Sequence, residues 1–559
     1  MTYLTPDGEY YVGLYPPEGS EKLGVLYPRT GALGGCSQHN ALITVLPNEN
    51  DWNYIASITG DSSWESGNMR KYFERLESTH YLPNSITGHG FSGWLQTQLT
   101  PLILVVEDLK LLALVIAAAT AMGQDLAGKV INTVAGLLEI LTLDLNNDSP
   151  DRDDVDLLYQ IPLTMNEEYA RSSPRDFVLD VANAVNDDGS KKYKLDIALN
   201  TLVTKVNFDI SGTTPKATGV DYLVGKSLYR ADTRASRGSN DGTPGSVSAS
   251  REVILSAGSF NTPQLLKLSG IGPSPELESF DIPVIQDLPG VGGNMQDRYE
   301  VGLVGQAPSN FSLLQGCTFL QGPYAEDDPC YDRWASTPVG YLKGTYTTNG
   351  IAFGYVSHSS VADAPLGPDV FVGGVPGFFD GYYPGYSVRA TARHDIWTWL
   401  VLKAHSRNAA GTVNLTSSNP RDVPNITFRS FSQGGEDDLQ AVYEGVRYGM
   451  QAFADLVPLD GASFAQVWPP ANVSSEDDLK QFIRDEAWGH HASCTCPIGA
   501  DDDPLAVLDA GFRVRGVDGL RVVDASVFPR IPGTYIALPI YMVSEKAADV
   551  IIAAAEGSP

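Results

Sequence analysis

The segment that most constrains the fold is residues 258–272, which read GSFNTPQLLKLSGIG directly after the apolar stretch Val253-Ile254-Leu255. The apolar stretch predicts a buried strand, and the glycine after it lets the backbone turn close to a ligand. Thr262 suits a helix N-cap, Pro263 the first helical position and Gly270 the exit. Such strand–turn–helix units bind nucleotides at the carboxyl edge of α/β sheets, so we expect an α/β fold.

Length and charge bound the class of protein. The chain has 559 residues, 43% of them hydrophobic and 19% charged, which indicates a globular protein of two domains or of one large cofactor domain with an insertion. The formal net charge of −29 repels nucleic acid and anionic membranes, so we expect neither as a partner. The apolar window 111–122 is too short to span a bilayer and predicts a buried helix. The polar, Gly- and Ser-rich residues 231–250 predict an exposed loop.

Several further motifs follow one another along the chain in a fixed order. Together with residues 258–272 they resemble the glucose-methanol-choline (GMC) family of flavin oxidoreductases, and the resemblance extends from about residue 26 to residue 552. The matching segments are LGGCSQHN at residues 33–40, the following Asp51 and Trp52, VGGNMQD at residues 291–297, SRNAAGTVNL at residues 406–415, and GLRVVDASVFPRIPG at residues 519–533.

The resemblance implies FAD as cofactor and oxidation of a CH–OH donor as the reaction. It also implies an overall α+β protein, in which a Rossmann-like FAD-binding domain carries an inserted substrate domain built on a mainly antiparallel sheet. We expect the FAD-binding domain in residues 1–307 and 486–559, and the substrate domain in residues 308–485. The predicted partners are a small-molecule alcohol and an electron acceptor, either dioxygen or a quinone.

The start of the sequence departs from the family pattern. FAD-binding domains of this type begin with a strand, a GxGxxG turn and a helix, whereas residues 1–19 contain Pro6, Pro16 and Pro17, which exclude a central strand. We interpret this as an amino-terminal truncation, or as a protein that manages without the unit. We expect the chain as written to fold poorly or to bind FAD weakly.

The candidate catalytic residues lie near the carboxyl terminus. Proton abstraction from an alcohol suits an imidazole, whose pKa is near neutral, and the chain offers His490 and His491. In the family pattern the catalytic histidine precedes a threonine by four residues, as His491 precedes Thr495, so the resemblance implies His491 as base, with His490 as reserve. Tyr535 stands where the family usually has histidine or asparagine. Tyrosine is a poor base at neutral pH, so it is either a hydrogen-bond donor or a pocket wall.

The resemblance also implies a set of cofactor contacts. Gly34 and Gly35 allow close approach of the backbone, and Asp524 either binds ribityl hydroxyls or only forms a turn. The motif GGCSxHN is similar to that of choline oxidases, in which its histidine is bonded to the flavin, so His39 is either a covalent link or a non-bonded neighbour. The full predicted set is Leu33, Gly34, Gly35, Cys36, His39, Asn40, Ala41, Leu42, Val203, Ala257, Gly258, Asp524, Ala525 and Ile536.

The remaining features give weaker predictions. Cys317 and Cys330 could pair, and the histidines and cysteines lack the short paired spacings of zinc sites, so no metal is expected. The aromatic loop 377–386 lines an apolar pocket or packs its own rings, and Trp397 and Trp399 are candidate substrate contacts. Two alternatives to alcohol oxidation stay open, a hydroxynitrile-lyase type of reaction and a non-catalytic remnant. Localisation is open between secretion and the cytoplasm.

Overall fold

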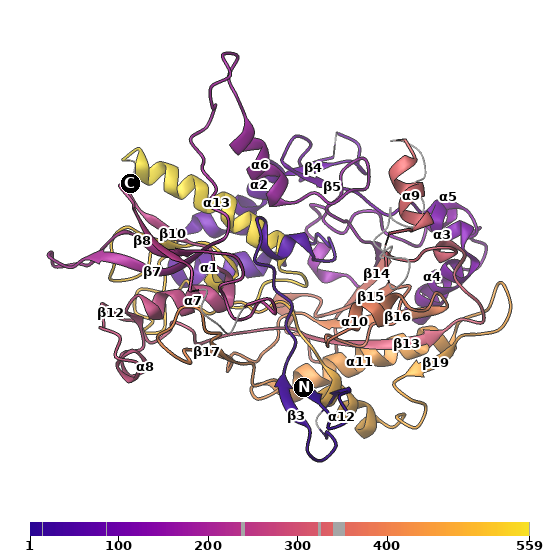
Figure 1. Cartoon of the computed structure of the whole chain (residues 1–559). Helices are drawn as coiled ribbons and strands as arrows, with labels where there is room; N and C mark the ends of the chain where they lie inside the picture. Colours follow the sequence, from indigo (N-terminus) through magenta and orange to yellow (C-terminus); the bar gives the residue numbers. More distant parts are fainter. Residues whose placement is uncertain (14, 85, 236–240, 322–325, 339–352, 558–559) are drawn as a thin grey trace.

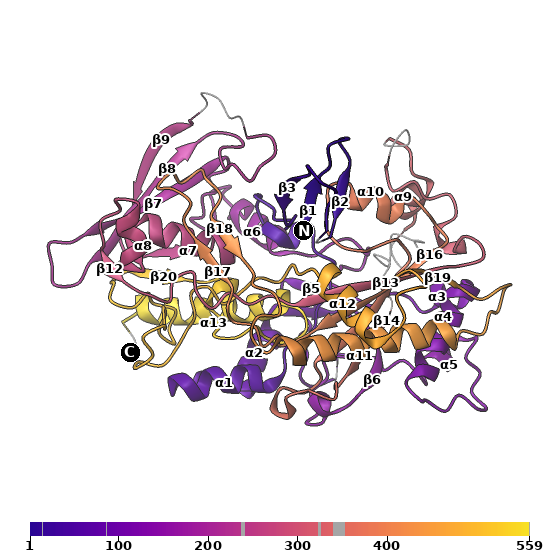
Figure 2. The ribbon, with the colours of Figure 1, turned by 90° about the horizontal axis from the view of Figure 1, so that it is seen from below.

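The computed structural model describes residues 1–559 except 14, 85, 236–240, 322–325, 339–352 and 558–559. Helices and strands gather at two ends of the molecule, and the carboxyl-terminal segment returns to the end that carries α7 (Gly258–Leu268) (Figure 1). The other end carries a large sheet and the helix α11 (Gly435–Ala454), which Figure 2 shows running along that sheet. The chain therefore leaves the first end and comes back to it, as an inserted domain requires.

The large sheet is six-stranded and antiparallel throughout, in the order β19-β13-β16-β15-β14-β6. This confirms the predicted mainly antiparallel sheet. Strands β6 and β13 lie in residues 1–307, and the other four strands lie in residues 308–485. Both expected domains therefore contribute strands to this sheet. The strands are β6 (Leu157–Gln160), β13 (Tyr299–Gln306), β14 (Phe353–Ser357), β15 (Val370–Val375), β16 (Ile396–Lys403) and β19 (Ala465–Trp468).

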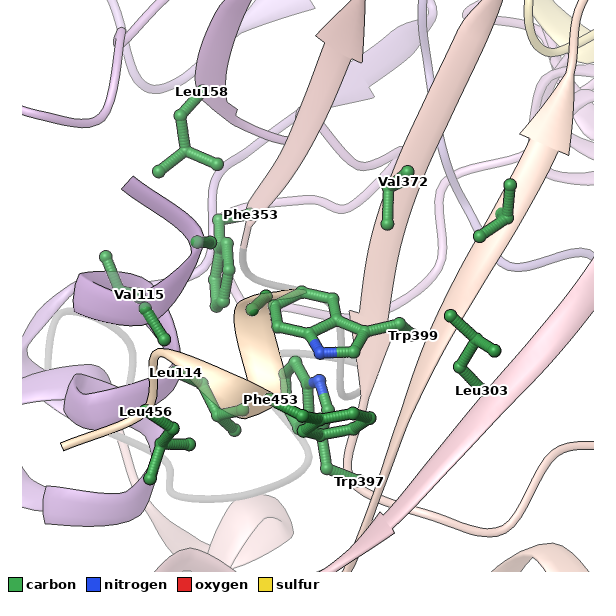
Figure 3. Packing of buried hydrophobic residues seen from close by; sticks show 14 of the residues in the cluster. Leu114, Val115, Leu158, Leu303, Phe353, Val372, Trp397, Trp399, Phe453 and Leu456 are labelled. Carbon is green, nitrogen blue, oxygen red and sulfur yellow. The ribbon is translucent and has the colours of Figure 1, made fainter. Parts of the chain in front are cut away.

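The largest core lies between this sheet and the helices α4 (Leu109–Ala121) and α11. Helix α4 is apolar almost all round and buries nine of its side chains, which confirms the buried helix predicted at residues 111–122. Trp397 and Trp399, two residues apart on β16, share one face of the strand and are each 1% exposed (Figure 3). Their prediction as substrate contacts is wrong, because both pack inside this core against Phe353 and each other.

At the opposite end, β10 (Val253–Leu255) pairs in parallel with β20 (Leu520–Val522), and α7 follows β10 directly. The helix begins earlier than the sequence predicts: Ala257 is its N-cap, Gly258 its first residue, and Pro263 lies inside it. Pro263 has no N–H for the carbonyl of Ser259, and that carbonyl accepts a hydrogen bond from the Thr495 hydroxyl instead, at 2.7 Å. Thr495 belongs to residues 488–495, which contain His490 and His491 and are called the histidine segment below. A side chain of this segment thus bonds to the carbonyl that the proline leaves without a donor.

Next to this pair lies a three-stranded antiparallel sheet of β7 (Thr201–Asp209), β8 (Lys216–Val224) and β9 (Thr243–Ser248). The loop predicted at residues 231–250 is therefore wrong for its last part. Strand β9 is an edge strand with mostly exposed side chains, so its sequence lacks the alternating apolar pattern that predicts a strand. Its backbone pairing with β8 is what makes it a strand.

The other elements surround these layers. Cys317 and Cys330 form a disulfide, as the sequence allowed, and no helix among the described residues is long and apolar enough to cross a membrane. The remaining strands are β1 (Thr2–Leu4), β2 (Tyr10–Val12), β3 (Glu21–Gly24), β4 (Glu77–Thr79), β5 (Leu95–Thr97), β11 (Ile271–Gly272), β12 (Gln286–Asp287), β17 (Thr412–Asn414) and β18 (Asn425–Thr427). The remaining helices are α1 (Glu49–Thr59), α2 (Ser66–Leu76), α3 (Ile103–Glu107), α5 (Val134–Leu137), α6 (Pro174–Asn183), α8 (Ser274–Ser279), α9 (Pro329–Ser336), α10 (Tyr386–Thr391), α12 (Glu476–Glu486) and α13 (Ala537–Ala555).

Candidate functional site

The histidine segment lies against the start of β13. Glu300 and Trp488 exchange two backbone hydrogen bonds, of 2.9 and 3.0 Å, and Gln296 and Ser493 form a second antiparallel bridge. Between these two bridges the chain carries His490 and His491. Residues far apart in sequence are thereby held in register, with the Glu300 side chain next to both imidazoles.

Two partly buried side chains fix the backbone of this segment. The Asp297 carboxylate accepts hydrogen bonds from the His491 N–H at 2.8 Å and from the Tyr27 hydroxyl at 2.6 Å. The Tyr27 oxygen in turn accepts from the Ala492 N–H at 2.7 Å, and its ring contacts the rings of Phe260 and Phe428, which also contact each other. Neither residue was predicted as part of the site, although Asp297 closes the VGGNMQD motif.

His491 is a buried, neutral imidazole. Its side chain is 9% exposed, and burial first, then the neighbouring His490 and the charge of Arg298, hold its pKa well below the ordinary 6.5. The Tyr535 ring meets it edge-on, with the ring centroids 5.7 Å apart, and burial raises the pKa of Tyr535 well above 10. The site therefore brings together a proton acceptor and a phenol that keeps its proton, both of them predicted.

His490 lies beside His491, with ring centroids 4.1 Å apart and the ring planes tilted by 50°, and 28% of its side chain is exposed. Burial and the charges of Arg29 and Arg298 lower its pKa. Its ring also touches Tyr382 of the aromatic loop, and Phe379 of that loop packs against Trp488. The rings of the aromatic loop pack on one another, which was one of the two alternatives, and that the loop lines an apolar pocket stays a prediction.

Two buried ionisable side chains complete the surroundings, and neither was predicted from the sequence. Glu300 is 5% exposed, and burial, with the nearby Asp297, raises its pKa to about 8. Arg298 is 1% exposed and donates to the carbonyls of Pro532 and Gly533 through Nη2. Its Nε and Nη1 have no hydrogen-bond partner within the described part of the chain. Single charged residues carry no spacing signal, so only the fold could reveal them.

The LGGCSQHN motif adjoins the histidines through Arg29. The guanidinium donates to the His490 carbonyl at 3.2 Å and lies 3.6 Å from the Cys36 sulfur. His39 is exposed, contacts the Thr30 hydroxyl through Nδ1, and has a pKa lowered by partial burial and by the charges of Arg29 and Arg171. A covalent flavin link through His39 remains a prediction.

Within the same motif, several residues shape the loop. Gly34 and Gly35 both adopt left-handed backbone angles, with φ of 91° and 57°. Asn40 accepts from the Arg171 side chain at 2.5 Å and from the Leu42 N–H at 3.2 Å, so its amide is used in fixing the turn. The other predicted contacts are spread over this end of the molecule: Leu33 at the start of the motif, Ala41 directly after it, Val203 on β7, and Ile536 as the N-cap of α13.

The turn after β10 is held by Asp524, which follows β20. Its carboxylate accepts from the Gly258 N–H at 2.8 Å, from the Thr262 hydroxyl at 2.6 Å, and from the Ser526 N–H at 2.7 Å. It therefore acts as the turn former of this structure, and its contact with a ribityl chain stays a prediction. Ala257 donates to Thr262, and the Ala525 carbonyl accepts from Cys494.

These residues fit a large polar cofactor. A Cβ placed on Gly35 or on Gly258 would meet no atom within 4 Å, so both backbones present an open face. Among the described residues, the buried polar atoms without a hydrogen-bond partner include Nε and Nη1 of Arg298, whose charge acts on His491, and Oγ1 of Thr534. Open glycine backbone and spare donors are what the pyrophosphate and the polar edge of a flavin require.

Comparison with known proteins identifies the family. Two family models, both described as GMC oxidoreductase, match residues 178–300 and 407–544. The oxygen-dependent choline dehydrogenase of Yersinia pseudotuberculosis serotype IB is 29% identical over 525 residues, which cover 94% of this chain and 80% of that protein. The mitochondrial choline dehydrogenase of Mus musculus is 33% identical over 359 residues, covering 63% of this chain and 53% of that protein.

Solved structures share the fold. Formate oxidase from Aspergillus oryzae RIB40 superposes with a TM-score of 0.76 at 20% identity, over 98% of this chain and 88% of that one. A fungal aryl-alcohol oxidase superposes with a TM-score of 0.65 at 20% identity, over 94% of this chain and 86% of that one. The matched family models, the order of the motifs and the shared fold lead to one conclusion: the chain belongs to the GMC oxidoreductase family and is an FAD-dependent oxidoreductase.

Proposed function

We propose that the protein oxidises an alcohol, a CH–OH donor, with His491 accepting the hydroxyl proton. The observation that carries the proposal is the buried imidazole of His491, kept neutral by its surroundings and fixed from its backbone by Asp297. A neutral ring nitrogen held in place needs no prior loss of a proton to act as a base. His490, whose ring lies beside it, is the reserve candidate.

The remaining residues have supporting roles in this proposal. The alcohol O–H bond breaks as its proton passes to a ring nitrogen of His491, and Tyr535 donates a hydrogen bond to the oxygen that is left. Bound FAD would supply the acceptor for the hydride of the carbinol carbon, so that the product would be an aldehyde or a lactone. Dioxygen or a quinone then removes the two electrons.

The class of substrate is supported by two observations. Relatives and structural neighbours include choline dehydrogenases and an aryl-alcohol oxidase, whose names point to alcohols. Next to His490 lies the aromatic loop, with Tyr382 on the histidine ring at 5.6 Å between centroids. We propose that the substrate carries its hydroxyl on an apolar or aromatic carbon frame that packs against these rings.

Anaerobic mixing of the flavin-loaded protein with a panel of primary alcohols tests the proposal. We expect at least one alcohol to bleach the flavin absorbance, because hydride transfer without an acceptor leaves the flavin reduced. Turnover of a hydroxynitrile without any bleaching would instead support the lyase alternative. Neither bleaching nor turnover with any compound would favour a non-catalytic protein.

A further inference from the structure

A cluster of three ligand atoms lies at the centre of the site. They are Oε1 of Glu300, Nδ1 of His490 and Nδ1 of His491, and all three lie within 4.8 Å of one another. Glu300 and His491 are each at least nine-tenths buried. None of the three atoms has a hydrogen-bond partner in the described residues. Buried polar atoms are seldom left without partners, so this convergence calls for a shared one.

The spacing of these atoms suits a metal ion. Oε1 of Glu300 lies 3.3 Å from Nδ1 of His490 and 3.6 Å from Nδ1 of His491. A tetrahedral zinc ion with bonds of about 2.0 to 2.1 Å holds neighbouring ligand atoms about 3.3 Å apart. One carboxylate with two imidazoles is also a ligand set that zinc uses, with the fourth position left to water.

The backbone preorganises the three ligands. Glu300 and Trp488 are paired by two hydrogen bonds, and Asp297 holds the His491 N–H, so both sides of the cluster are fixed before any ion arrives. The Arg298 guanidinium nearby opposes a cation, whereas the Asp297 carboxylate favours it. The spacing rule that predicted no metal could not detect this cluster, because Glu300 joins the histidines only through the fold.

We propose that Glu300, His490 and His491 form a binding site for one divalent transition-metal ion, with Zn²⁺ as the best match. Binding at the two Nδ1 atoms does not depend on the proposed function. If His491 is the base, the proposal extends to regulation: a bound ion competes with the proton for the electrons of this imidazole, so Zn²⁺ inhibits alcohol oxidation reversibly.

Binding of Zn²⁺ alone to the purified, chelator-treated full chain tests the site, by calorimetry and by the visible absorption of Co²⁺ as a replacement ion. We expect one ion per chain, and at least tenfold weaker binding in Glu300→Gln and in His490→Asn. The control is His358→Asn, which removes another histidine–carboxylate pair, His358 with Asp156 at 2.7 Å, on the surface. That variant should bind Zn²⁺ as the wild type does.

Three results would overturn the site: no Zn²⁺ bound by the wild type, unchanged affinity in both cluster variants that remain folded by circular dichroism, or loss of binding in His358→Asn alone. Glu300→Gln keeps the number of heavy atoms in the core, and His490→Asn changes a partly exposed side chain. Misfolding of one variant therefore does not imply misfolding of the other. Flavin bleaching by alcohols is measured without metal, so failure there leaves the metal result standing, and the reverse also holds.

Discussion

At the scale of single residues, the account depends on the protonation state of His491. Its pKa lies well below 6.5 because burial and three neighbouring groups, His490, Arg298 and Arg29, disfavour the imidazolium. A lowered pKa means that the neutral base persists into mildly acidic solution. Tyr535, with a pKa raised well above 10, keeps its proton over the same range and remains a donor.

This protonation state predicts a particular pH profile. For an oxidised alcohol, we expect no inflection of kcat/KM that belongs to His491 between roughly pH 8 and 6.5, because its pKa lies below the ordinary histidine value, whereas an inflection near pH 8 belongs to Glu300. The measurement is initial rate against pH under saturating acceptor. An inflection above pH 6.5 in the wild type that disappears in His491→Asn would contradict the low pKa.

Other residues show what sequence patterns could and could not reveal. His490, His491 and Tyr535 were found from motifs, since the family pattern fixes their spacing. Glu300, Arg298 and Tyr27 were not found, because a lone charge or ring gives no periodic signal and their role arises only when β13 and the histidine segment pair. Trp397 and Trp399 were misassigned, since a tryptophan in the core and one in a pocket look the same in sequence.

At the scale of elements, the contact between α7 and the histidine segment replaces a hydrogen bond that Pro263 cannot make. The Thr495 hydroxyl donates to the Ser259 carbonyl in its place. The structure predicts that Thr495→Val lowers the free energy of unfolding by about 1 to 3 kcal/mol, because the buried Ser259 carbonyl loses its donor. In a Pro263→Ala background the cost should be smaller, since the restored N–H can bond that carbonyl. Urea unfolding of the double-mutant cycle measures this, and equal costs in both backgrounds would show that the carbonyl is not the link.

A second contact between elements is made by the buried side chain of His89, which hydrogen-bonds both β4 and the loop after α5. His89 contacts Glu77 at 2.8 Å through Nδ1 and Asp144 at 3.0 Å through Nε2, with its side chain 0% exposed. Burial lowers its pKa, but hydrogen bonds to the two carboxylates outweigh this and raise it to about 9. The histidine therefore stays charged between its two partners at neutral pH.

The raised pKa sets the direction of the pH effect. The stability that His89 contributes is fully present below pH 6.5 and is lost as pH rises through about 9. His89→Asn should cost about 3 kcal/mol at pH 6 and clearly less at a pH above 9, by urea unfolding of variant and wild type in parallel. His358→Asn, at the surface, is the matched control with little cost at either pH. The same cost for His89→Asn at both pH values would refute the assignment.

At the scale of the whole molecule, the sequence predicted the sheet and the buried helix better than the contacts between distant segments. The antiparallel sheet, the buried helix α4 and the disulfide all follow from patterns that are local or carried by motifs. The early start of α7 was not predicted. Thr262 and Pro263 favour a helix that begins near them, but the Asp524 carboxylate, which follows β20, bonds to the Gly258 N–H and stabilises a start at Gly258. Long-range hydrogen bonds of this kind are invisible in sequence.

The most direct test of the central claim is the rate of anaerobic flavin reduction by a bleaching alcohol in His491→Asn, followed by stopped-flow absorbance against the wild type at equal flavin content. The account predicts a fall of at least about 100-fold, because the hydroxyl proton then has no acceptor. A variant that reduces its flavin within threefold of the wild-type rate would show that His491 is not the base.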